Sequence, residues 1–189
     1  KNLLKHNVTV IGISRKHTIK HKNYFAISFD LNDLTNIKNI LDDIILKHKK
    51  IDAIISSAGY GFFENLENFK EKEVIDFFNV NLLAHILISK ILVSHFKKKK
   101  TGHFIFMGSE ASLKGNQKST LYTAAKHGLL GFVKSFREEC NKSEIRVTII
   151  NPGMVNSSFF KKLKFSPGKS IKNSIKLEDI AELVFFILK

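Results

Sequence analysis

Tyr122 and Lys126 are the two residues of this chain whose types and spacing best suit acid–base chemistry. On a helix, residues four apart lie one turn apart on the same face. An ammonium group close to a phenol favours the phenolate, so Lys126 would lower the pKa of Tyr122 and make it a candidate acid or base near neutral pH. A lone Tyr-x-x-x-Lys pair is also an ordinary amphipathic pattern, so the surrounding sequence has to decide between the two interpretations.

Ser109 is a third candidate for the same chemistry. It follows an apolar run, residues 103–107, that predicts a buried strand. Open α/β sheets bind their ligands at the carboxyl ends of their strands. Ser109 therefore stands at a position that suits a site residue.

The chain resembles the short-chain dehydrogenase/reductase family over nearly its whole length. The resemblance rests on five motifs that occur in the family's order. They are Ser56-Ser57-Ala58-Gly59, Asn79-Val80-Asn81, Ser109, the Tyr122-x-x-x-Lys126 pair thirteen residues after that serine, and Asn151-Pro152-Gly153. Five motifs in one order are far more specific than any of them alone.

The resemblance implies an oxidoreductase that transfers a hydride between a nicotinamide cofactor and a carbonyl or alcohol substrate. Tyr122 would exchange a proton with the substrate oxygen, and Lys126 would lower the pKa of Tyr122 and hold the nicotinamide ribose. Ser109 would donate a hydrogen bond to the same oxygen, where charge develops. Asn81 would help to hold a water molecule that links Lys126 to solvent.

The resemblance also implies a set of cofactor-binding residues: Ser14, Arg15, Asp30, Leu31, Ser56, Ala58, Gly59, Tyr122, Lys126, Pro152, Gly153, Val155 and Ser157. In this set Asp30 and Leu31 would contact adenine, and the segment 56–59 would lie along the adenosine ribose. Val155 and Ser157 would meet the nicotinamide carboxamide. The first serine of the segment 56–59 replaces the family's asparagine, which is a departure from the pattern.

The residues after the second strand of the fold bear on the choice between NAD and NADP. NAD-preferring enzymes carry an acidic residue there, whereas this chain has Ser14 followed by Arg15 and Lys16. An aspartate would repel the 2′-phosphate of NADP, and an arginine would bind it. We therefore expect NADP rather than NAD. The alternative is that Arg15 and Lys16 are solvated cations of a loop.

Strands and helices alternate along the chain, which predicts a doubly wound parallel sheet with helices on both faces, a three-layer Rossmann-like α/β/α fold. The predicted strands are residues 8–13, 24–29, 51–55, 103–107 and 145–150. The predicted helices are residues 34–47, 69–99, 120–141 and 177–188, with the tail of a helix at 1–6 and a connection at 154–175. The sequence has no repeat, linker or break in composition, so we expect one domain, 1–189.

A glycine-rich phosphate-binding turn, expected after the first strand of this fold, is missing, since Gly12 is the first glycine. We interpret 1–189 as a fragment of a slightly longer chain, without the first and last strands of the fold. In the strand order 3-2-1-4-5-6, strands 8–13 and 51–55 would then lie two strand spacings apart, about 9.5–10 Å, without direct hydrogen bonds. We expect these residues alone not to form a stable monomer.

The chain is strongly basic, with a formal net charge of +14 from 31 Lys and Arg against 17 Asp and Glu. A basic chain can bind nucleic acid. Here the lysines are dispersed, and the one dense run, Lys97–Lys100, ends a predicted helix, where cations complement the helix dipole. We therefore expect no nucleic-acid partner, although a nucleic-acid-binding module stays an alternative.

Cys140 is the single cysteine, which excludes an internal disulfide and suits a reducing compartment. Its place late in a predicted helix predicts a buried or half-buried, inert thiol. No Cys/His cluster has the spacing of a metal site. Polar residues interrupt the longest apolar stretch, 80–96, and no signal peptide is visible, so we expect no membrane span. We expect a cytoplasmic homodimer or homotetramer.

Two matters stay open at this point. A nucleotide-binding or regulatory protein that retains the fold without turnover is the main alternative to an enzyme, because the phosphate-binding turn is missing. The sequence does not identify the substrate either. Phe159, Phe160, Leu163 and Phe165 would line an apolar pocket or, alternatively, pack against a neighbouring helix or subunit.

Overall fold

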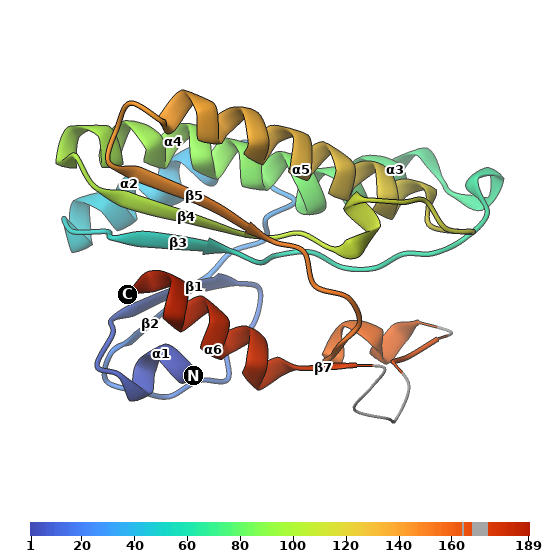
Figure 1. The fold of residues 1–189 in the computed structure, drawn as a ribbon, viewed down its shortest axis with the longest axis horizontal. Coiled ribbons are helices and arrows are strands. Elements are labelled where there is room, and N and C mark those ends of the chain that lie inside the picture. Colours follow the sequence, from blue (N-terminus) through green and yellow to red (C-terminus); the bar gives the residue numbers. More distant parts are fainter. Residues whose placement is uncertain (164, 168–173) are drawn as a thin grey trace.

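The structure, a computed structural model, describes residues 1–163, 165–167 and 174–189 (Figure 1). One parallel sheet has the order β3-β4-β5 and contains β3 (Ala53–Ser56), β4 (Gly102–Met107) and β5 (Ile145–Ile150). A second parallel pair contains β1 (Val10–Ser14) and β2 (Tyr24–Ser28). A short parallel pair follows, β6 (Val155–Asn156) with β7 (Ile175–Lys176).

Strand β4 is the centre of the larger sheet and its most buried element. Its residues from Gly102 to Phe106 are all buried. Phe104 lies opposite Ile54 on one side and Val147 on the other. A strand covered on both faces reads as a continuous apolar run, which is the pattern that predicted it.

Helices cover both faces of this sheet, as Figure 1 shows. On one face lie α2 (Ile37–His48), α3 (Glu71–Phe78), α4 (Ala84–Lys99) and α5 (Thr120–Cys140). On the other lie α1 (Asn2–Lys5) and α6 (Leu177–Leu188), which are joined by stacking of the His6 and Phe185 rings, with centroids 3.9 Å apart. The short helical turns are η1 (Leu66–Asn68), η2 (Asn79–Leu83), η3 (Glu110–Ser112) and η4 (Ser158–Lys162). This arrangement confirms the predicted three-layer α/β/α fold.

Apolar stripes at helical spacing form the main core. The stripe of α2 is Ile37, Leu41 and Ile44; that of α4 is Ala84, Ile88, Leu92 and Phe96; and that of α5 is Leu129, Val133, Phe136 and Cys140. These spacings place each stripe on one helix face. Helix α4 packs on β4, α5 packs on β5, and α2 packs on α4. Cys140 is buried as expected, and burial raises the pKa of its thiol.

Two helices have an end marked by charged residues in the sequence. The Glu73 carboxylate accepts the backbone N–H of Lys70 at the start of α3, with 2.9 Å between N and Oε2. The lysine run closes α4, where Lys100 takes a left-handed conformation with φ of 53°. The cations therefore lie at the negative end of the helix dipole, as predicted.

β1 and β3 are not hydrogen-bonded to each other anywhere in the described part of the chain, since β1 pairs with β2 and β3 pairs with β4. This confirms the expectation that these strands are not direct neighbours. Side chains join the two sheets instead, because Ile11, Ile13 and Ile27 pack against the main core.

Two expectations need correction. The helix predicted at 69–99 is not uniform, because the π-helical turn Asn79–Leu83 separates α3 from α4. The sequence predicted no membrane span here, because polar residues interrupt the apolar stretch. The run Glu71–Lys99 is nevertheless long and apolar enough to cross a membrane by length and composition, with a mean hydropathy of 1.6 over its best window. Its buried stripe packs on the sheet, and the core helix of a three-layer fold passes the same test.

Candidate active site

Ser109 and Tyr122 come together beyond the carboxyl end of β4. Ser109 follows that strand closely and caps η3, where its Oγ accepts the N–H of Ala111 at 3.2 Å. Tyr122 lies in the first turn of α5 and packs on a small core made of Phe77, Leu121 and Ala125. A side-chain hydrogen bond joins Ser109 to Tyr122. The two hydroxyls are therefore placed to meet one substrate oxygen.

The pKa of Tyr122 is raised above its ordinary value of 10, which corrects the expectation that it is lowered. Burial is the largest cause, because it disfavours the phenolate. The hydrogen bond from Ser109 acts in the opposite direction, and the charge of Glu110 raises the pKa further. Burial therefore outweighs the hydrogen bond from Ser109, and the phenol keeps its proton at neutral pH.

Lys126 lies one turn further along α5 and is only 5% exposed. Its Nζ lies 5.8 Å from the centroid of the Tyr122 ring and donates a hydrogen bond to the backbone oxygen of Met107 at 2.9 Å. Burial lowers the pKa of Lys126 to about 8. Tyr122 and Lys126 therefore share one helix face, as expected. The hydrogen bond to Met107, the last residue of β4, holds the Lys126 ammonium near the Tyr122 ring.

Asn81 is fully buried in the π-helical turn between α3 and α4. Its Nδ2 donates to the backbone oxygen of Phe77 at 3.0 Å, and its Oδ1 accepts the N–H of Tyr60 at 3.1 Å. A π-helical turn leaves irregular backbone within a helix and is frequent at functional sites. The two bonds fix the Asn81 side chain between this turn and the loop after β3.

The loop after β3 contains the predicted contacts Ser56, Ala58 and Gly59. Ser56 is buried, and Gly59 is exposed with φ of 154°, a conformation that L-residues rarely adopt. A Cβ at Gly59 would lie 2.7 Å from the Oδ1 of Asn81. The backbone therefore passes close to Asn81, and only glycine fits there.

His85 is a residue of this region that the sequence analysis did not place in the site. Its ring is 1% exposed and hydrogen-bonds with Ser56 Oγ at 2.6 Å and the backbone oxygen of Ala58 at 3.0 Å. Two features of the sequence could have pointed to this contact. Ser56 departs from the family motif, and His85 lies 29 residues later within the longest apolar stretch.

The predicted adenine end of the site lies where β1 and β2 finish. Ser14 Oγ donates to the backbone oxygen of Lys16 at 2.8 Å, and an Arg15 nitrogen lies 4.0 Å from an Asp30 oxygen, with the Arg15 side chain 76% exposed. Leu31 is half-buried against the main core. Burial raises the pKa of Tyr60, and the charges of Arg15 and Asp30 also act on it, so this end of the site faces the loop after β3.

The segment after β5 closes the opposite side. The Oδ1 of Asn151 accepts the N–H of Ser109 at 3.2 Å, and the oxygen of Pro152 accepts the N–H of Glu110 at 2.9 Å. Gly153 approaches Glu110, since a Cβ there would lie 3.4 Å from its Oε2. Asn151 thus fixes the backbone that carries Ser109, a role its sequence motif did not reveal.

The last two predicted contacts lie just beyond, in and after β6. Val155 pairs with Ile175 of β7, and the Oγ of Ser157 accepts the N–H of Phe159 at 3.3 Å, so it caps η4. These residues are held by local bonds, and among the described residues neither of them is hydrogen-bonded to Tyr122.

Comparison with known proteins identifies the family of this chain. A profile of the short chain dehydrogenase family matches residues 3–166. The 3-oxoacyl-(acyl-carrier-protein) reductase FabG of Buchnera aphidicola subsp. Acyrthosiphon pisum is 30% identical over 200 residues, which cover 99% of this chain and 82% of that protein. The chain belongs to the short-chain dehydrogenase family.

Solved structures share the fold of this short-chain dehydrogenase. An alcohol dehydrogenase from the archaeon Thermococcus sibiricus, complexed with 5-hydroxy-NADP, superposes with a TM-score of 0.85 at 22% identity and covers 99% of this chain and 82% of its own. A 3-ketoacyl-(acyl-carrier-protein) reductase from Brucella melitensis, complexed with NADH, gives a TM-score of 0.86 at 19% identity, with 100% and 84% covered. At these identities the likeness establishes the fold.

Aromatic rings surround Tyr122 in this short-chain dehydrogenase. The Phe63 and Phe159 rings lie 5.2 and 5.9 Å from the Tyr122 ring, between centroids. Phe165 contacts both Phe63 and Phe160, at 5.0 and 5.8 Å. Of the two alternatives for the segment after β6, this arrangement favours the one in which its phenylalanines border the site. Phe63, from the loop after β3, was not anticipated.

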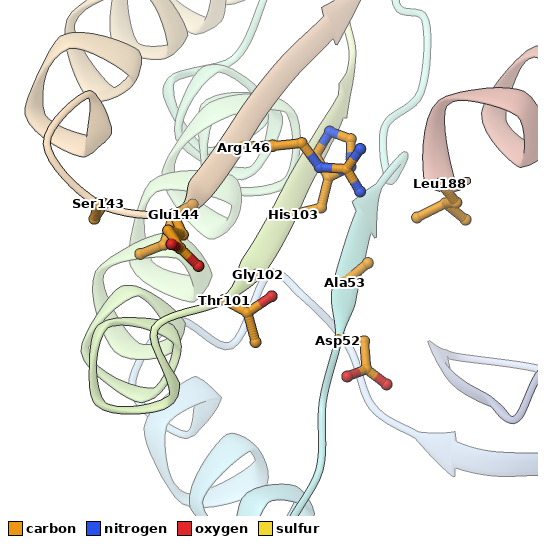
Figure 2. Close-up of a pocket in the computed structure, with 10 residues that line it drawn as sticks. Asp52, Ala53, Thr101, Gly102, His103, Ser143, Glu144, Arg146 and Leu188 are labelled. Atoms are coloured by element: carbon orange, nitrogen blue, oxygen red, sulfur yellow. The ribbon is translucent and has the colours of Figure 1, made fainter.

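A pocket of about 450 Å³ lies at the amino ends of β3, β4 and β5 (Figure 2). Acidic and basic side chains both line it, among them Asp52, Glu144 and Arg146, as does the buried His103. Because this is the end of the sheet opposite Ser109 and Tyr122, we do not assign the pocket to the candidate active site. Across the described residues, no group of three or more His, Cys, Asp or Glu side chains is arranged to hold a metal ion.

Proposed function

We propose that this chain transfers a hydride between a nicotinamide cofactor and a carbonyl or alcohol substrate. The observation that carries the proposal is the convergence of Ser109, Tyr122 and Lys126 beyond the carboxyl end of β4, with the two hydroxyls hydrogen-bonded and the ammonium buried beneath the ring. The family membership supports the proposal, because a relative that matches 99% of this chain is named as a reductase.

The residues of the crevice fit such a cofactor. The exposed Gly59 lets a ligand approach the backbone closely. Among the described residues the Lys126 ammonium donates to one acceptor, the backbone oxygen of Met107, so further N–H groups remain to donate to a hydroxyl. A bound reduced nicotinamide supplies the hydride to the carbonyl carbon.

The protein's own part is proton transfer and charge stabilisation. The phenol of Tyr122, kept protonated by its raised pKa, gives its proton to the carbonyl oxygen as the hydride reaches the carbon, so that the carbonyl gains one hydride and one proton and becomes an alcohol. Ser109 donates a hydrogen bond to that oxygen as charge develops. Lys126 then stabilises the phenolate that Tyr122 becomes.

NADP is the cofactor that the adenine end favours. Arg15 is exposed and lies 4.0 Å from Asp30, a loose ion pair that leaves most of the guanidinium able to bind a 2′-phosphate. We expect Arg15→Ala to weaken NADPH binding roughly tenfold to hundredfold and NADH binding little, because only NADPH carries that phosphate. Equal losses for both cofactors would refute this role of Arg15.

Turnover tests the proposal directly. NADPH oxidation by the full chain is followed with a panel of aldehydes, ketones and β-ketoesters, and NADPH affinity is measured separately by titration. Substrate-dependent oxidation supports the reductase. Binding of NADPH without oxidation of any carbonyl would instead support a nucleotide-binding or regulatory protein that retains the fold.

A further inference from the structure

Two side chains of one helical run hold the loop after β3 at successive points. Asn81 accepts the N–H of Tyr60 at 3.1 Å. His85, one turn later, reaches the start of the same loop through Ser56 and Ala58, at 2.6 and 3.0 Å. Residues four apart face the same side of a helix, so these two side chains form a clamp along the loop.

The partners of His85 determine its proton positions. The backbone oxygen of Ala58 can only accept, so the Nε2 of His85 must carry a proton. In a neutral ring the Nδ1 is then an acceptor, and the Ser56 hydroxyl donates to it. Burial and the charge of Lys126 on α5 both disfavour a second proton, and they lower the pKa of His85 to about 4. The ring is therefore neutral near pH 7, with Nε2 as donor and Nδ1 as acceptor.

The bond to Ala58 also orients the next peptide group. In a trans peptide the C=O of one residue and the N–H of the next point in opposite directions. Because the Ala58 oxygen points to His85 on α4, the N–H of Gly59 points away from that helix. Gly59 is exposed, and among the described residues none accepts a hydrogen bond from its N–H.

We infer that His85 is a positioning residue, whose neutral ring holds Ser56 and Ala58 so that the Gly59 N–H is presented to the cofactor. The inference rests on the proposed function, because the ligand presented with this donor is the nucleoside part of the nicotinamide cofactor. Ser56 is shorter than the asparagine that the resemblance places there, and His85 supplies the reach that the serine lacks. His85 itself touches neither the substrate nor the reacting atoms.

Imidazole ¹⁵N NMR of the full chain tests the clamp without any turnover. The His85 signals are identified by their loss in His85→Leu. We expect an Nε2–H tautomer that stays neutral at pH 5.5, where an ordinary histidine, with a pKa of about 6.5, is mostly protonated. An Nδ1–H tautomer, or titration near pH 6.5, would overturn the assignment of donor and acceptor.

Steady-state kinetics tests the positioning role. His85→Leu removes both hydrogen bonds, and we expect it to raise the KM for NADPH about tenfold while kcat changes less than about twofold. His85→Gln can still donate an amide N–H toward Ala58, so its KM is expected to lie closer to that of the wild type. The Ser56→Ala/His85→Leu double variant is expected to be no worse than His85→Leu alone, because both remove the same bond.

His103→Leu is the matched control, because it removes another buried histidine from the far end of the sheet. His103 is 3% exposed and hydrogen-bonds with Thr148 Oγ1 at 2.9 Å. We expect His103→Leu to change stability and leave the KM for NADPH unchanged. An equal rise in KM for both variants would overturn the inference, since it would reflect general destabilisation.

Failure of the proposed function and failure of the positioning role of His85 give different results. If the wild-type chain does not oxidise NADPH, the proposed function fails. Amide exchange at Tyr60, whose N–H is hydrogen-bonded to Asn81 in the same loop, still tests the clamp, with faster exchange expected in His85→Leu. If the wild type turns over and His85→Leu keeps the wild-type KM, the positioning role fails and the proposed function stands.

Discussion

At the scale of single residues, burial is the largest cause of the pKa shifts in the candidate active site. It raises the pKa of the Tyr122 phenol and lowers the pKa of the Lys126 ammonium, because both neutral forms are favoured away from water. A neutral phenol is the form that donates a proton, and a lysine with a pKa of about 8 is still largely charged at pH 7. The two shifts therefore suit reduction of a carbonyl near neutral pH.

Removing the Tyr122 hydroxyl tests its role as proton donor. Tyr122→Phe keeps the ring that packs on Phe77 and Ala125 but removes the oxygen, so we expect carbonyl reduction to fall by about 10²–10⁴-fold with the fold intact. Tyr24→Phe is the control, since it removes a hydroxyl that binds His17 at 2.7 Å on β2. Circular dichroism and NADPH turnover are measured on both. Near wild-type turnover of Tyr122→Phe would rule out the mechanism.

The charge of Lys126 predicts an alkaline limit on activity. Below pH 8 the ammonium is protonated and can stabilise the phenolate of Tyr122, and above that pH it loses its proton. We expect kcat/KM for reduction to fall above pH about 8, since that quantity reports groups of the free enzyme. Lys126→Met should be nearly inactive at every pH. A wild-type profile that stays flat to pH 9.5 would show that the charge of Lys126 is not required.

At the scale of secondary structure, irregular elements present the site and regular ones support it. The π-helical turn Asn79–Leu83 directs Asn81 to the loop after β3, and that loop passes the asparagine at Gly59 with φ of 154°. The regular helix α5 carries Tyr122 and Lys126 on one face, with Gly131 further along it. Substitutions of the two glycines should therefore have opposite effects.

Gly59→Ala should destabilise the protein, and Gly131→Ala should stabilise it. A Cβ at Gly59 would press on Asn81 Oδ1 at 2.7 Å in a backbone conformation that costs about 1–3 kcal/mol for other residues. Gly131 lies inside α5 with nothing within 4 Å of an added Cβ, so alanine there should raise the free energy of unfolding by about 0.5–1 kcal/mol. Urea unfolding measures both. The same sign for both substitutions would contradict this account of Gly59.

At the scale of the whole molecule, two parallel sheets share one core without sharing a hydrogen-bonded strand pair in the described residues. Two buried histidines lie at opposite ends of the larger sheet. His85 lies against the carboxyl end of β3, and His103 lies in the amino-terminal part of β4. Burial is the largest cause that lowers the pKa of each to about 4. Stability should therefore depend on pH in mildly acidic solution.

We expect the free energy of unfolding to fall as the pH falls from 6.5 to 4. In this range the unfolded chain binds a proton at each of the two histidines and the folded chain does not, so acid favours unfolding; above pH 6.5 both states are neutral there and the effect vanishes. Each histidine contributes up to ~3 kcal/mol at the acid end. Urea unfolding across this range should show a smaller pH dependence in His85→Leu and in His103→Leu than in the wild type. An unchanged slope in both variants would contradict the two pKa shifts.

The alternation of apolar strands and amphipathic helices determined the fold class and most element positions. Each apolar strand or helix face has to be buried against another element, and few packing arrangements of strands and helices allow this. Residues 145–150 and 177–188 lie within the predicted bounds as β5 and α6. The spacing of Tyr122 and Lys126 likewise placed them on one helix face. Only the tertiary structure decided that burial raises the pKa of Tyr122, that the π-helical turn separates α3 from α4, and that His85 binds Ser56. Each of these depends on groups brought together from distant parts of the chain, and neither desolvation nor a contact across 29 residues is visible in local pattern.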